Sequence, residues 1–119
     1  MLPSNRAFNG MVDNVTNNFV EYLIKLKIAN AVYPSRHFFE RIVERNLEKQ
    51  LPFLVKMVYS VYVQLKRTTF NNRTYKVRWK ELIVIAGIRV GEVSDRRRVV
   101  VITVWDKDSN EGYDEEIVL

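Results

Sequence analysis

The sequence predicts a single α+β domain in which helices come first and an antiparallel sheet follows. Its 119 residues are close to the commonest size of one domain, and 47% of them are hydrophobic, enough for one core. Apolar residues recur at helical spacing up to about residue 70, whereas β-branched residues dominate and alternate after it. We therefore expect N-terminal helices packed on a three- to four-stranded antiparallel sheet.

The first predicted helix covers about residues 11–30. It is expected to end before residues 33–34, because a residue that precedes proline avoids helical backbone angles. Apolar side chains recur along it every three or four positions, which gives one buried stripe. The stripe consists of Met11, Val15, Phe19, Leu23 and Leu26, and it is broadened by Tyr22, Ile24 and Ile28.

Two further helices are predicted before the strands. The second runs over about residues 36–47 behind Ser35, a residue type that caps helix N-termini well. The third begins near Leu51 with Pro52 in its first turn, where the missing N–H costs little. Its end near Val61 is rich in β-branched residues, so an extended conformation is also compatible with it.

Four strands are predicted in the second part of the chain. Residues 73–79 alternate, with Tyr75, Val77 and Trp79 on one face and Lys76 and Arg78 on the other. Residues 81–90 are nearly all apolar, as in a central strand covered on both faces. Residues 97–106 form a valine-rich strand, and residues 113–119 a short edge strand. Three acidic residues would protect that edge from further pairing: Asp114, Glu115 and Glu116.

The composition excludes several classes of protein. The chain has no cysteine, which removes disulfide frameworks, thiolate nucleophiles and cysteine zinc sites. It shows neither a signal peptide nor a transmembrane run of about 20 apolar residues. We therefore expect a soluble, cytoplasmic protein without a membrane partner. The net charge of +5 favours a polyanionic partner: nucleic acid first, an anionic membrane second and an acidic protein third.

Familiar catalytic and cofactor motifs are missing. The sequence has no glycine-rich phosphate loop, no nucleophile elbow, no HExxH pair and no zinc-finger spacing. A single histidine leaves only carboxylates as metal ligands, and Asp106 with Asp108 lacks the rest of a calcium loop. We therefore expect no cofactor and no metal site.

The segment 35–48, SRHFFERIVERNLE, is the most informative stretch. On a helix, its charged residues fall on one side and its apolar residues on the other. His37, Arg41 and Arg45 step by four and lie along one row. The charged side also carries Glu40 and Glu44, and the apolar side carries Phe38, Phe39, Ile42 and Val43.

A row of one imidazole and two guanidinium groups suits the cleavage of RNA by its own 2′-hydroxyl. Histidine can exchange a proton near neutral pH. Arginine can grip two oxygens of the phosphate. The same pattern is also that of an ordinary solvated face of an amphipathic helix, with surface ion pairs.

A second basic group is predicted on the sheet. Lys76 and Arg78 share one strand face, Arg89 interrupts an apolar strand, and Arg97 belongs to a basic run, 96–98, that can clamp phosphate or be solvated. Arg89 either opens onto a groove or lies at a strand end beside a turn. Thr103 is either a satisfied β-former or a hydroxyl that faces substrate. Among the aromatic residues, Trp79 is the candidate for stacking on a base.

The helical pattern S-x-H-x-x-x-R, followed by a second helix and a meander that ends in a valine-rich strand with threonine, resembles the phage RegB-type endoribonucleases and, more distantly, the RelE-like RNase toxins. The pattern falls on Ser35, His37 and Arg41, and the order of elements matches over about residues 33–106. The resemblance implies a RelE-like core over 33–119 with an accessory helix in 1–32. It also implies metal-independent cleavage of RNA to a 2′,3′-cyclic phosphate, with His37 and Arg41 in the active site.

One departure from the RegB pattern matters. RegB has a second important histidine, whereas this chain has Met57 or Tyr59 near that place. Arg89, Arg78, Lys76 or Tyr59 would have to substitute for it. In an endoribonuclease we expect Arg89 to be a catalytic residue that binds the scissile phosphate together with Arg41 and Arg45. The resemblance implies mRNA as substrate, association with the ribosome, an antitoxin or host protein as partner, and a phage or toxin origin. The alternative is a non-catalytic regulator on the same fold that binds RNA or a host protein.

Overall fold

The computed structural model describes residues 5–93, 96–106 and 112–119. Within them, three α-helices precede most of a five-stranded mixed sheet, so the predicted α+β class is confirmed. The helices are α1 (Asn5–Lys25), α2 (Arg36–Glu44) and α3 (Leu51–Arg67), with a short 3-10 turn, η1 (Glu48–Gln50), before α3. The strands are β1 (Val32–Pro34), β2 (Arg73–Trp79), β3 (Leu82–Val90), β4 (Arg97–Trp105) and β5 (Glu115–Val118).

The sheet is mixed, so the predicted purely antiparallel sheet of three to four strands was wrong. Its order is β1-β4-β3-β2-β5. The central strands β2, β3 and β4 form the expected antiparallel meander, but β1 pairs in parallel with β4, and β5 pairs in parallel with β2. Both outer strands are short. The chain around residues 33–34, expected only to end a helix, is the edge strand β1.

Helix α1 lies about five residues earlier than predicted. Its buried stripe is Val12, Val15, Phe19 and Leu23. Met11, Ile24 and Leu26, which were assigned to the stripe, are 41%, 59% and 45% exposed. The helix ends because Lys27 adopts a left-handed conformation with φ 61. This turn frees residues 32–34 to reach the sheet.

The start of α2 is fixed to the sheet by its cap. The Ser35 hydroxyl accepts a hydrogen bond from the Phe38 N–H at 3.1 Å and donates one to the Ile102 carbonyl of β4 at 2.8 Å. The predicted N-cap is therefore confirmed. The helix ends at Glu44, before the predicted residue 47, since Asn46 has a φ of 55. Helix α3 remains helical through Arg67, so its β-branched end is not extended.

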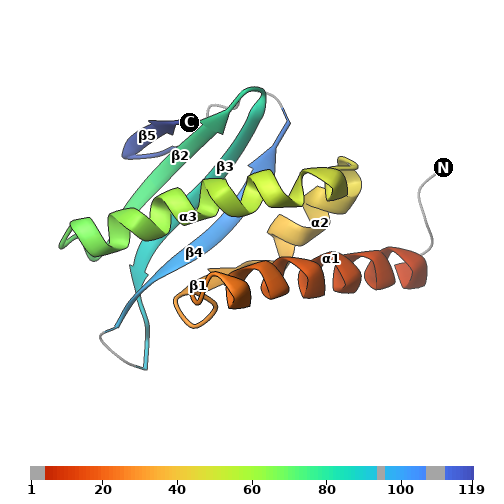
Figure 1. Cartoon of the computed structure of the whole chain (residues 1–119), viewed down its shortest axis with the longest axis horizontal. Coiled ribbons are helices and arrows are strands. Elements are labelled where there is room, and N and C mark those ends of the chain that lie inside the picture. The colour runs from red at the N-terminus through yellow and green to blue at the C-terminus, as the bar shows by residue number, and fades with distance from the viewer. Residues whose placement is uncertain (1–4, 94–95, 107–111) are drawn as a thin grey trace.

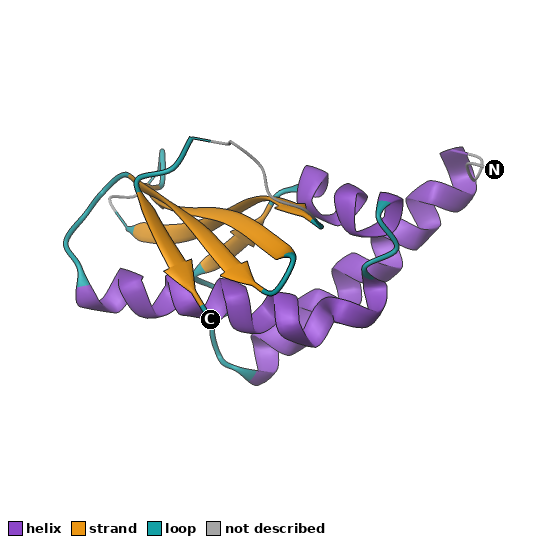
Figure 2. Ribbon diagram, turned by 90° about the horizontal axis from the view of Figure 1, so that it is seen from above, coloured by secondary structure: helices purple, strands orange, loops and turns teal. Residues whose placement is uncertain are grey.

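The molecule has two layers (Figures 1 and 2). Helix α3 runs along one face of the sheet, and α1 packs beside it on the same side. The core between the layers includes a cluster of three phenylalanines whose ring centroids lie 5.3–5.5 Å apart: Phe19, Phe38 and Phe39. Within the described ranges, the opposite face of the sheet carries no helix (Figure 2); we call it the helix-free face. None of the described helices is both long and apolar enough to cross a membrane.

Candidate nucleic-acid interface

Helix α2 borders the sheet on the side of β4, and the cap at Ser35 ties it there. Its apolar side is buried as predicted, with Phe38, Phe39, Ile42 and Val43 all in the core. The opposite side therefore has to face away from the core. His37 is exposed, whereas Arg41 and Arg45 are partly buried against the end of β4.

The row of His37, Arg41 and Arg45, which we call the α2 row, meets Trp105, the last residue of β4. The guanidinium carbons of Arg41 and Arg45 lie 4.8 and 5.5 Å from the centroid of the indole ring. Trp105 is paired with Ile83, whose side chain belongs to the helix-free face because its neighbours Leu82 and Val84 face the helices. The row and the helix-free face are thus continuous at this corner, which we call the α2–β4 corner.

Polar contacts connect the side chains of the corner to one another. Arg41 Nε donates to Nε2 of His37 at 3.4 Å, and its Nη1 lies 3.5 Å from a carboxylate oxygen of Glu44. Arg45 makes a closer ion pair with Asp106, at 2.8 Å. Both arginines keep about a quarter of their side-chain surface exposed. The 3.4 Å contact is too long to hold His37 firmly, so an incoming group can displace it.

Among the described residues, three buried polar side-chain atoms on this side of the sheet have no hydrogen-bond partner. They are the hydroxyl oxygen of Thr103, the indole nitrogen of Trp105 and Nε of Arg98. Thr103 pairs with Ile85 and is only 4% exposed, so its side chain is covered by its neighbours. A buried polar atom without a partner costs about 1–3 kcal/mol. Of these residues, Trp105 is in contact with the α2 row.

Lys76 and Arg78 of β2 share one face of the strand, as predicted, and this is the helix-free face. Both side chains have contacts with other residues. Lys76 is only 5% exposed, and its Nζ lies 5.1 Å from the centroid of the Tyr113 ring. Arg78 donates from Nε to Glu116 of β5 at 3.0 Å. This pair is about one-third exposed on both sides, so a phosphate can compete for the guanidinium.

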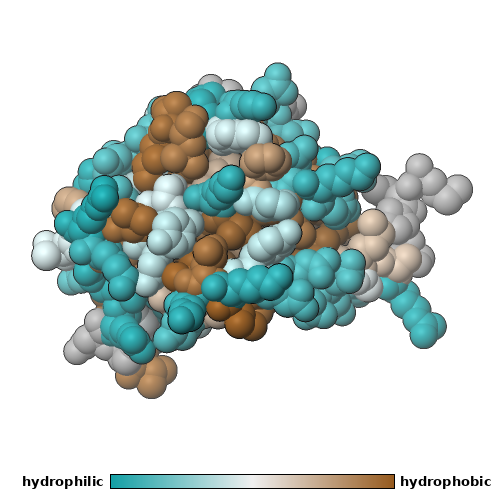
Figure 3. All heavy atoms as spheres, in the orientation of Figure 1, coloured by the Kyte–Doolittle hydropathy of each residue, from teal (hydrophilic) through white to brown (hydrophobic). Residues whose placement is uncertain are grey.

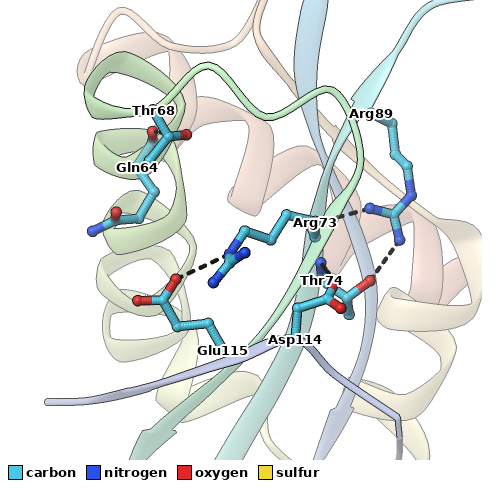
Figure 4. Close-up of polar contacts among 7 residues, drawn as sticks. All are labelled: Gln64, Thr68, Arg73, Thr74, Arg89, Asp114 and Glu115. Atoms are coloured by element: carbon cyan, nitrogen blue, oxygen red, sulfur yellow. Dashed lines mark hydrogen bonds and ion pairs between the residues drawn. The ribbon is translucent and has the colours of Figure 1, made fainter.

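Arg89 is hydrogen-bonded to Arg73 and Thr74 of β2 (Figure 4). Its Nη1 donates to the carbonyls of Ile88 and Arg73, and its Nη2 donates to the Thr74 hydroxyl, at 2.8–3.1 Å. The guanidinium therefore points from β3 toward β2, away from β4. Gly87 makes room for it, because a Cβ there would collide with the guanidinium. The structure does not bring Arg89 and His37 together.

Acidic residues at and just before the start of β5 bind β2 close to Arg89. We call this region the β2–β5 seam. Glu115 accepts from Arg73 Nε at 3.1 Å, and a carboxylate oxygen of Asp114 accepts from the Thr74 N–H at 2.7 Å (Figure 4). Beneath them, the side chain of Tyr75 is fully buried. Burial and, to a lesser degree, the charge of Glu115 raise the pKa of Tyr75.

Arg97 and Trp79 lie on the side of the sheet that faces the helices. Arg97 donates to the carbonyls of Leu65 and Phe70, at 2.9 and 3.0 Å, and so satisfies the C-terminal end of α3. Trp79 stacks on Phe53 with centroids 4.3 Å apart and an interplanar angle of 12°. Neither residue is continuous with the α2 row, and the Trp79 ring already has an aromatic partner.

Sequence reasoning missed two features of the interface. Trp105 was one of several aromatic residues, and only the fold shows that it supports both arginines of the row. Arg98 was one member of a basic run, yet its guanidinium carbon lies 4.7 Å from the centroid of the Tyr33 ring on β1. Alternation alone would place positions 98 and 105 on opposite faces of β4, and the irregularity of pairing next to Ile85, which the sequence does not show, puts both on the helix-free face.

In the part of the chain that the structure describes, no three or more histidine or acidic side chains gather so that they could hold a metal ion. Comparisons with family models, with curated proteins and with solved structures each found no match. The functional reading therefore depends on the geometry of the α2–β4 corner.

Proposed function

We propose that this protein is a metal-independent endoribonuclease with a RelE-like fold, whose reaction centre is the α2–β4 corner. One observation carries the proposal. The guanidinium of Arg41 joins the imidazole of His37 to the ring of Trp105, with contacts of 3.4 Å and 4.8 Å. A proton acceptor and a phosphate-binding cation are two of the groups that cleavage of RNA uses, and an aromatic ring can stack on a base.

The reaction follows from these groups. His37 takes the proton of a ribose 2′-hydroxyl, and the oxygen attacks the adjacent phosphorus. The bond from phosphorus to the 5′-oxygen breaks, and that oxygen takes a proton from the imidazolium or from water. The products are a 2′,3′-cyclic phosphate and a 5′-hydroxyl. Arg41 and Arg45 hold the phosphate oxygens, where charge builds up in the transition state.

The helix-free face provides a path for the flanking nucleotides. Arg78 and Arg98 lie on this face, the second stacked on Tyr33, and both can bind backbone phosphates. Among the described residues, Trp105 at the corner has an indole nitrogen without a hydrogen-bond partner. Arg89, which is bonded to β2, positions the sheet and takes no part in the reaction.

The test is a cleavage assay on total cellular RNA in excess EDTA, with the new ends mapped. Wild type is expected to make discrete cuts with cyclic phosphate ends. His37→Ala is expected to make none while it unfolds at the same temperature as wild type. Arg36→Gln is the matched control, since Arg36 lies on the same helix, is 56% exposed and pairs with Glu40 outside the row. Equal cutting by His37→Ala and wild type would refute the proposal.

A second candidate is a non-catalytic regulator that binds RNA through the same surface. It is favoured by the single histidine of the sequence, since RNA cleavage usually uses both a base and an acid. This candidate predicts RNA binding that weakens steeply with salt, without any product, in wild type and His37→Ala alike. The same assay, followed by a filter-binding measurement at two salt concentrations, separates the two candidates.

A further inference from the structure

An elongated groove lies on the opposite side of the molecule, between α3 and the end of β5. It has a volume of about 530 Å³. One side is a row of α3 residues spaced by three or four, from Phe53 through Met57, Ser60 and Val63 to Arg67. The other side is formed by Trp79, Ile117 and Leu119. In Figure 3, which shows this face, hydrophobic surface gathers where β5 ends and continues between the polar side chains of α3.

The groove lies along a strand with an unused edge. β5 is the last strand of the sheet, and no described segment pairs with its outer side. The N–H of Leu119 donates inward to the Arg78 carbonyl of β2. Because backbone groups alternate along a strand, the N–H groups of Glu116 and Val118 point outward. Val118 and Leu119 are 69% and 52% exposed, so nothing apolar covers this edge in the described part of the chain.

The charged residues that line the groove are basic and favour an acidic partner. The two charged residues in its lining are Lys56 and Arg67, and no acidic side chain of the described residues lines it. An extended segment with acidic and apolar side chains therefore fits the groove and the edge together. β5 has this composition itself: Asp114, Glu115 and Glu116 precede Ile117, Val118 and Leu119.

We propose that two copies of this chain associate through β5, which pairs antiparallel with the β5 of the second copy. A two-fold axis then joins the two sheets into one. Leu119 and Trp79 lie at the Lys56 end of the groove, because Trp79 stacks on Phe53 and Lys56 Nζ lies 5.8 Å from the Phe53 ring. Antiparallel pairing brings the acidic beginning of the second β5 to this basic end. The two helix-free faces then continue into one surface on the other side.

The test is the mass of the protein in solution, measured by sedimentation and light scattering over a range of concentrations. Wild type is expected at twice 14.1 kDa. Val118→Pro removes an outward N–H that β2 does not use, and edge strands accept proline at such a position. This variant is expected to be a monomer with an unchanged circular dichroism spectrum.

A charge reversal provides a second variant that leaves the backbone intact. Lys56→Glu should raise the dissociation constant of the dimer by about tenfold or more, because like charges then face each other. Lys49→Glu, an exposed residue outside the groove, makes the same change of charge and should leave the dimer intact. A wild-type monomer at the highest concentration reached would overturn the proposal. An acidic segment of another protein would then be the partner that fits the groove. A dimer that both Val118→Pro and Lys56→Glu leave unchanged would also overturn it.

Discussion

Arg41 on helix α2 and Arg89 on strand β3 have opposite surroundings. At the α2–β4 corner, Arg41 contacts an exposed imidazole, an indole ring and a partly exposed carboxylate. At the β2–β5 seam, Arg89 donates to two backbone carbonyls and a hydroxyl. Carbonyls of a sheet cannot move away, whereas a surface side chain can. The same residue type therefore holds the fold at the seam and is available to a ligand at the corner.

The first prediction concerns cleavage and has the largest expected effect. Arg41→Gln should lower the rate of RNA cleavage by about 10²–10³-fold, the usual loss when one donor to a developing charge is removed. Its melting temperature should stay close to that of wild type, since Arg41 has only weak internal contacts. Arg97→Gln, which removes a cation on the helix side, is the matched control for rate. A rate loss shared by both variants would remove the distinction between corner and scaffold.

The second prediction is that a substitution at the β2–β5 seam lowers stability and leaves cleavage unchanged. Arg89→Met keeps the apolar stem but removes the guanidinium, so the free energy of unfolding should fall by about 1–3 kcal/mol. Cleavage by the remaining folded protein should be unchanged. Urea unfolding gives the first quantity and the RNA assay the second. A variant that is fully stable but inactive would move Arg89 from the scaffold to the reaction centre.

Local patterns predicted most of the fold, and long-range pairing explains what they missed. The cap at Ser35, the proline start of α3 and the alternation in β2 are set within a few residues, and all are confirmed. The parallel pairing of β1 with β4 joins segments 67 residues apart, as at Val32 and Val99. Three residues ending in proline carry no strand pattern of their own, so only the tertiary partner reveals this strand.

For the candidate site too, the sequence predicted the local arrangement and not the long-range one. The spacing of four along α2 placed His37, Arg41 and Arg45 in one row, which helix geometry alone requires. The sequence could not show that Arg89 turns toward β2 rather than toward α2, because that choice depends on the space above Gly87 and on the Thr74 hydroxyl. The acidic residues 114–116 were expected to protect an edge. That role stays a prediction, and the structure shows in addition that Glu115 and Glu116 make ion pairs with β2.

The third prediction concerns pH and the seam. The pKa of Tyr75 is raised, so the folded state binds its phenolic proton more tightly than the unfolded state does. The stabilisation is fully present below the ordinary pKa of about 10 and is lost as the pH rises above it. The free energy of unfolding should therefore fall more steeply above that pH in wild type than in Tyr75→Phe. Tyr59→Phe, at an exposed position on α3, should keep the wild-type slope.

The last prediction concerns Arg78, whose surroundings are intermediate between those of Arg41 at the α2–β4 corner and those of Arg89 at the β2–β5 seam. Its ion pair with Glu116 is short, at 3.0 Å, but both side chains are about one-third exposed. A double-mutant cycle with Arg78→Gln and Glu116→Gln should give a coupling energy of about 0.2–1 kcal/mol that decreases with salt. A coupling this weak would let phosphate replace the carboxylate, so Arg78 would act with the α2 row in holding RNA. A coupling that persisted at high salt would instead place Arg78 with Arg89 among the residues that hold the sheet together, and the path for RNA would then depend on Arg98.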